Sequence, residues 1–189
     1  MEFQKLKKSE MRDHKYTEEL VDHYWGSINY VSSLIKASEI KAGLILSFYG
    51  ILLNFSYKFI EIILTSTPSK TLLFVLLGAS FMCTLTSIYF SIRCFMPRIE
   101  ATYEKNVFFF KDVISKFGTI KEFSKTFYKI SLNEEQLFDQ LGQQIYIISK
   151  IASIKFKYVN KSLRFLALSL LFLLVSLAYN LIITSILEY

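Results

Sequence analysis

The stretch FLALSLLFLLVSLAYNLIITSIL, from Phe165 to Leu187, decides the fold because it is long, apolar and free of charged side chains. Two further apolar runs precede it, Ile40 to Leu64 and Thr71 to Phe95. A helix needs roughly 20 residues to cross a hydrocarbon core about 30 Å thick, and each run is long enough. The sequence therefore predicts an all-α membrane protein with three transmembrane helices.

Lysine and arginine residues set the expected orientation. Of the 22 in the chain, seven precede Ala42 and twelve lie between Pro97 and Arg164, whereas only Lys58 and Lys70 lie near the link between the first two spans. Because basic residues are retained on the cytoplasmic side, we predict the N-terminus inside and the C-terminus outside. The net charge of +6 suits this retention and anionic lipid headgroups, so we expect a lipid bilayer and no nucleic acid as a partner.

The chain divides into four expected segments. They are a cytoplasmic N-terminal amphipathic helix (1–39), a transmembrane helical hairpin (40–96), a cytoplasmic helical region (97–164) and a third transmembrane helix (165–187). No proline or glycine separates residues 27–39 from the first span, so we predict one long helix through both.

Three helices are expected in the cytoplasmic region. The spacing of apolar residues predicts one over 100–117 and a short one over 121–128. Ser131 or Asn133 can cap the next helix, with Glu134 and Glu135 in its first turn. That helix should enter the third span without a break.

The sequence carries no enzyme motif. It has no phosphate-cradling glycine loop, no His-Glu metal helix and no nucleophile elbow, so we expect neither an enzyme nor a cofactor. His14 and His23 lie in the polar N-terminal segment without a nearby cysteine, and no metal site is predicted.

Lys155 interrupts an apolar stripe on the last cytoplasmic helix, where an unpaired ammonium would be unfavourable. It needs an anionic partner, and the sequence leaves three open: Glu39, a lipid headgroup or the phosphate of a small ligand. In the N-terminal segment, Tyr24, Trp25 and Tyr30 suit stacking against a base, and packing on a cytoplasmic helix face or an interfacial aromatic belt explains them equally well.

Charged residues near membrane depth form a second candidate group. Lys58 and Glu61 lie three residues apart near the outer end of the first span, with Asn54 one turn deeper. Interfacial snorkelling explains them, and so does a polar strip that lines a water path.

Several short segments resemble the membrane domain of Pycsar-type transmembrane effectors. The first span opens with Glu39, a spacer and Lys41-Ala42, where the family pattern has Asp in place of Glu39. The other matching segments are Met96-Pro97-Arg98, Asn106-Val-Phe-Phe109, Gln144-Ile-Tyr-Ile-Ile-Ser-Lys-Ile151 and Lys155 to Tyr158. Their order and spacing extend the resemblance over about residues 20 to 180.

The resemblance implies a multi-pass protein of the bacterial inner membrane that acts in antiviral defence. A cyclic pyrimidine mononucleotide, cyclic CMP or cyclic UMP, would activate it during phage infection, and loss of membrane integrity would follow. Candidate ligand contacts are Glu39, Lys41, Lys150, Lys155 and Lys157. Three helices enclose a pore poorly, so homo-oligomers are expected, with Asn54, Lys58 and Glu61 as the candidate polar path. Two alternatives stay open: a membrane scaffold that docks a partner protein, and a holin-like protein that needs no ligand.

Overall fold

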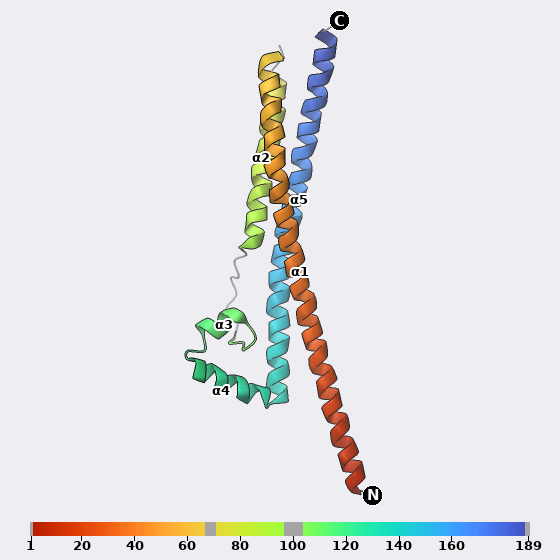
Figure 1. Ribbon diagram of the computed structural model, residues 1–189, viewed down its shortest axis with the longest axis vertical. Helices are drawn as coiled ribbons and strands as arrows, with labels where there is room; N and C mark the ends of the chain where they lie inside the picture. The colour runs from red at the N-terminus through yellow and green to blue at the C-terminus, as the bar shows by residue number, and fades with distance from the viewer. Residues whose placement is uncertain (1, 67–70, 97–103, 188–189) are drawn as a thin grey trace. The chain divides into compact units, whose positions relative to one another are not determined.

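The computed structural model describes residues 2–66, 71–96 and 104–187, and among these it has five helices and no strand. The helices are α1 (Glu2–Ser66), α2 (Thr71–Phe95), α3 (Phe110–Ser115), α4 (Ile120–Ser131) and α5 (Glu134–Leu187), as labelled in Figure 1. The prediction that α1 and α5 each run as one continuous helix is confirmed. The predicted break at Pro97 lies outside the described residues.

The chain forms two compact units, and both long helices contribute to each. One unit, called here the helical subdomain, comprises residues 1–34 and 99–152. The other, the membrane unit, comprises residues 35–98 and 153–189. Their border on α1 and α5 lies some residues before the predicted spans begin, so the membrane unit includes Glu39 and Lys155.

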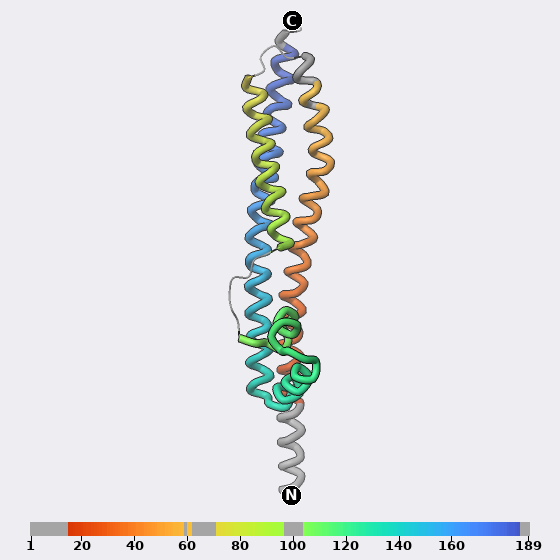
Figure 2. The backbone as a smooth tube through the Cα atoms, turned by 90° about the vertical axis from the view of Figure 1, so that its left-hand side faces the viewer, coloured from red at the N-terminus to blue at the C-terminus, as the bar shows by residue number. Residues whose placement is uncertain are grey.

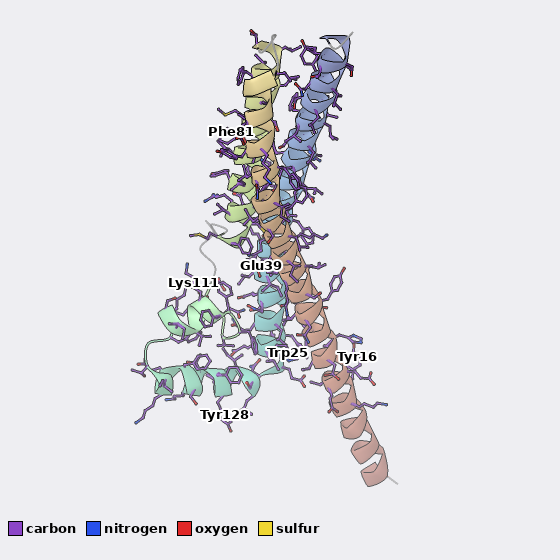
Figure 3. The ribbon with its side chains drawn as sticks, turned by 45° about the horizontal axis from the view of Figure 1, so that its top comes forward. Tyr16, Trp25, Glu39, Phe81, Lys111 and Tyr128 are labelled. Carbon is purple, nitrogen blue, oxygen red and sulfur yellow. The ribbon has the colours of Figure 1, made fainter. Side chains whose placement is uncertain are left out.

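The membrane unit is a bundle of three helices. In Figures 1 and 2 its parts of α1 and α5 run in one direction, and α2 runs antiparallel beside them. Each of the three helices that form it is long and apolar enough to cross a membrane. Large apolar side chains point outward, as Phe81 does in Figure 3. The exposed fraction of Phe81 is 51%. The all-α prediction with three candidate membrane helices is thereby confirmed.

Two apolar clusters are seen among the described residues of the membrane unit. One cluster joins Ala42 of α1, Cys94 of α2 and Val159 of α5. A second joins three buried α1 residues to partly buried residues of α2 and α5: Ile45, Tyr49 and Leu52 pack against Ile88, Leu166, Leu170 and Leu173. Many large apolar side chains of these helices therefore remain on the outside of the bundle.

In the helical subdomain, the predicted helix over 100–117 is wrong for residues 104–109 and 116–117, since α3 covers only Phe110–Ser115. Residues 100–103 of that prediction lie outside the part of the chain that the structure describes. Asn106 is fully buried, and its side-chain amide donates to the carbonyl of Gln140 at 2.7 Å while its side-chain oxygen accepts from the N–H of Phe108 at 2.9 Å. An Asn side chain that bonds nearby backbone competes with helix formation, which explains the turn.

The helices α4 and α5 begin at defined caps. Asn133 accepts a hydrogen bond from the N–H of Gln136 at 3.0 Å, so of the two predicted caps the structure uses Asn133. Thr119 and Glu122 form a reciprocal capping box at the start of α4, which extends further than the predicted 121–128.

The capping box predicts a pH effect on α4. The N–H of Thr119 donates to the Glu122 carboxylate at 2.9 Å, and this bond lowers the pKa of Glu122 from its ordinary value of 4.5. A carboxyl with a lowered pKa stabilises the folded state above its ordinary pKa, and that stabilisation is lost as pH falls through the lowered value. We expect faster amide hydrogen exchange in α4 below about pH 4.5, after correction for intrinsic rates. In Glu122→Gln this pH dependence should be absent; if it persists, the box is not its source.

Candidate functional site

A buried lysine joins all three helices of the membrane unit. The Lys155 ammonium donates to Glu39 Oε1 on α1 at 2.6 Å and to the carbonyl of Cys94 on α2 at 2.9 Å. Only 5% of the Lys155 side chain is exposed, against 39% of the Glu39 side chain. Of the three partners that the sequence left open for Lys155, the structure supplies Glu39.

The end of α2 explains why a lysine suits this position. The last four carbonyls of a helix lack partners within it, and the C-terminal end carries a partial negative charge. Because α2 ends at Phe95, the Cys94 carbonyl is one of these groups. Lys155 therefore binds a carboxylate and a helix end together, which offsets the cost of burying its charge.

Small residues let the three helices approach at this point. Ser38, Ala42 and Cys94 are each fully buried, and the Cys94 thiol donates to the Ser38 carbonyl at 3.8 Å. Close packing of this kind is what small side chains provide in membrane bundles. Burial is usual for a free cysteine, which behaves as a small apolar side chain.

The other predicted ligand contacts lie apart from this pair to different degrees. Lys41 is exposed on α1, and its Nζ lies 5.8 Å from the centroid of the Phe156 ring. Phe156 directly follows Lys155 in the chain. Lys157 is exposed, and because residues two apart point to different sides of a helix, it does not share the face of Lys155. Lys150 belongs to the helical subdomain. The structure thus brings Glu39 and Lys155 into direct contact and places Lys41 nearby.

The predicted polar path occupies an outward face of α1. Asn54, Lys58 and Glu61 are all exposed in the single chain. Their spacing of four and three residues places them along one side of the helix. A face that a single copy leaves uncovered is available to lipid headgroups or to another copy.

A polar interface between α2 and α5 was missed at the sequence level. Its side chains are buried and bear hydroxyl groups, and we call it the hydroxyl seam: Ser80, Thr84, Ser87 and Ser91 on α2, and Ser162 and Ser169 on α5. Ser162 donates to the carbonyl of Ser87 at 2.9 Å, and Ser87 donates to the carbonyl of Ser162 at 2.8 Å. The Thr84 and Ser169 hydroxyls are 2.7 Å apart.

A seven-residue spacing was the signal that could have revealed the seam. On α5, Lys155, Ser162, Ser169 and Ser176 follow one another at that interval, and all four are buried. On α2, Ser80, Thr84, Ser87 and Ser91 alternate by four and three. Such a repeat keeps one stripe of a helix against its neighbour, so Lys155 is the first member of the polar stripe of α5.

Aromatic side chains that the sequence left open between packing and stacking are engaged within the helical subdomain. Tyr24 lies 5.4 Å from Phe138, and Trp25 lies edge-on at 5.8 Å from Phe108, measured between ring centroids. Figure 3 shows Trp25 on the part of α1 that belongs to this unit. Helix packing accounts for both rings, whereas Tyr30 is 65% exposed.

Fold and site together define an all-α protein with helices long and apolar enough to cross a membrane, a separate helical subdomain and a buried ion pair in the membrane unit. The family model of the Pycsar effector protein domain matches residues 23–182. The chain therefore belongs to the Pycsar effector family, as its sequence segments indicated. Membership implies an effector role in anti-phage defence at the membrane.

Curated relatives agree with this assignment. The chain is 25% identical over 144 residues to the Pycsar effector protein PtPycTM of Propioniciclava tarda, covering 74% of this chain and 69% of that protein. It is 28% identical over 134 residues to the Pycsar effector protein SaPycTM of Staphylococcus aureus, covering 70% of this chain and 78% of that protein. No solved structure matches significantly.

Proposed function

We propose that this chain is a non-enzymatic membrane effector that a cyclic pyrimidine mononucleotide, cyclic CMP or cyclic UMP, switches on during phage infection. The active form impairs the integrity of the bacterial inner membrane, which stops growth before phage mature. The observation that carries the proposal is the family match over residues 23–182, because it includes both the helical subdomain and the membrane unit. An effector that combines detection and action in one chain needs both.

The proposed topology follows the distribution of basic residues. The N-terminus and residues 97–164 face the cytoplasm, where the nucleotide is made, and the C-terminus faces outward. The α1 and α5 helices run without interruption from the subdomain into the membrane unit, which supports a mechanical route from ligand to membrane. Binding favours one arrangement of these helices over another, as differential affinity for two states requires.

The proposed ligand contacts are those with basic or acidic groups near the cytoplasmic helices: Glu39, Lys41, Lys150, Lys155 and Lys157. Lys41, Lys150 and Lys157 are exposed to solvent, whereas Lys155 is buried and binds Glu39. Homo-oligomers then place the exposed face of Asn54, Lys58 and Glu61 between copies, where it lines a water path.

Membrane potential tests the proposal directly. Cells carry this chain with an active pyrimidine cyclase, with an inactivated cyclase or with none, and a potential-sensitive dye reports depolarisation. We expect depolarisation only with the active cyclase. Membrane fractionation in each strain controls for the amount of protein.

The alternatives predict different patterns in the same experiment. A holin-like protein depolarises cells without a cyclase, and a membrane scaffold leaves the potential unchanged in all strains. Either pattern, with the chain present in the membrane fraction, would contradict nucleotide activation.

A further inference from the structure

The Lys155–Glu39 pair lies at the border of the membrane unit. That unit begins at Ile35 on α1 and at Ser153 on α5. Both charged residues therefore lie within about one and a half helical turns of the point where the long helices pass from one unit to the other. Any movement transmitted along α1 or α5 reaches this pair before it reaches the seam and the rest of the bundle.

The two partners differ in their access to water. Lys155 is enclosed, with 5% of its side chain exposed, while Glu39 retains 39%. When the pair separates, Glu39 is solvated at little cost, but Lys155 loses its charged partner inside the bundle. Separation therefore favours any rearrangement that exposes Lys155 to water.

The hydroxyl contacts of the seam between α2 and α5 can exchange partners. A serine or threonine hydroxyl in a helix can bond its own backbone one turn earlier when its neighbour withdraws. Ser47, Thr86 and Ser185 already do so in this chain. Among the residues that the structure describes, the buried members of the apolar cluster beside the pair are Ala42, Cys94 and Val159, with Tyr158 against them, so the buried side chains there are small.

We propose that the Lys155 ammonium is the latch of the resting state: it ties α1, α5 and the end of α2 together, and its release opens the bundle. This rests on the proposed function, since it names how the resting effector is kept closed. Rotation of α1 against α5 separates Nζ from Oε1, which are 2.6 Å apart. The polar stripe that begins at Lys155 then gains access to water.

Ion leak without any nucleotide tests the latch. The full-length protein is reconstituted in phosphatidylethanolamine–phosphatidylglycerol vesicles, and potassium efflux is measured for the wild type, Lys155→Met and Glu39→Gln. Removing a charge-assisted bond shifts such an equilibrium by on the order of 10-fold, so both variants should leak about 10-fold faster than the wild type. Lys36→Met is the matched control, because it removes an exposed lysine of α1 in the same unit and should not leak.

The outcomes separate the latch from the proposed function. Faster potassium efflux in both variants, with no increase in the control variant, supports the latch. This holds whether or not cyclic CMP or cyclic UMP raises the efflux of the wild type. If Glu39→Gln incorporates with wild-type helicity and stays tight, the latch is wrong, even where the nucleotide opens the wild type. If Lys155→Met fails to incorporate into vesicles, the leak of Glu39→Gln alone decides whether the latch is right. Glutamine is as large as glutamate, and position 39 is partly exposed, so this variant should still fold.

Discussion

Ser162→Leu should destabilise the membrane unit by about 3 kcal/mol, since forcing a large side chain into a closely packed interface costs roughly 1–3 kcal/mol before hydrogen bonds are counted. Ser162 is fully buried at the centre of the hydroxyl seam. Its hydroxyl lies 3.0 Å from that of Ser87 and 2.7 Å from that of Ser91. Leucine would remove these contacts and push α2 away from α5. Reversible unfolding by a denaturing detergent in bicelles measures the change.

Two controls separate packing from hydrogen bonding at this position. Ser162→Ala keeps the small size and loses only hydroxyl bonds, which average about 0.6 kcal/mol each in a membrane bundle, so a loss of roughly 1–2 kcal/mol is expected. Ser185→Leu changes an exposed serine of the same helix and should be close to neutral. If Ser162→Leu were as mild as Ser185→Leu, the seam would not be a packed interface.

The helices could be predicted from sequence wherever local chemistry determines them. No proline interrupts α1 or α5, and both helices are continuous as expected; Asn133, one of the two expected caps, caps α5. The failure came at residues 104–109, where apolar spacing indicated a helix. There the deciding interaction is between Asn106 and Gln140, which are far apart in the sequence. Periodicity carries no information about such a bond.

The candidate site shows the same limit. Burial of Lys155 in an apolar stripe demanded an anion, yet the choice of Glu39 depends on how α1 packs against α5. The hydroxyl seam was harder to detect because serine is neutral in hydropathy. In addition, a serine hydroxyl can donate its hydrogen bond to a backbone carbonyl of its own helix, so it needs no partner on another helix. Only pairing of α2 with α5 gives Ser87 and Ser162 a common role, and that pairing comes from tertiary structure.

Lys155→Glu is the second substitution with a large expected effect. It places a second carboxylate beside Glu39 and opposite the Cys94 carbonyl, so three acceptors meet where an ammonium stood. Breaking a buried pair costs about 3–5 kcal/mol, and repulsion between like charges adds to it. We expect loss of at least about 3 kcal/mol in detergent-induced unfolding of the full chain. Lys157→Glu, an exposed change on the same helix, should stay within about 0.5 kcal/mol of the wild type.

Exchange of the two charges tests whether the pair itself is responsible. In Glu39→Lys/Lys155→Glu the attraction between positions 39 and 155 returns, so the double variant should regain much of the stability that Lys155→Glu loses. Recovery should be incomplete, because a carboxylate at position 155 cannot donate to the Cys94 carbonyl, which then lacks its 2.9 Å bond. A double variant no more stable than Lys155→Glu would mean that the carbonyl contact, and not Glu39, holds Lys155 in the bundle. The difference in unfolding free energy between the wild type and the double variant measures what the end of α2 contributes to the junction of the three helices.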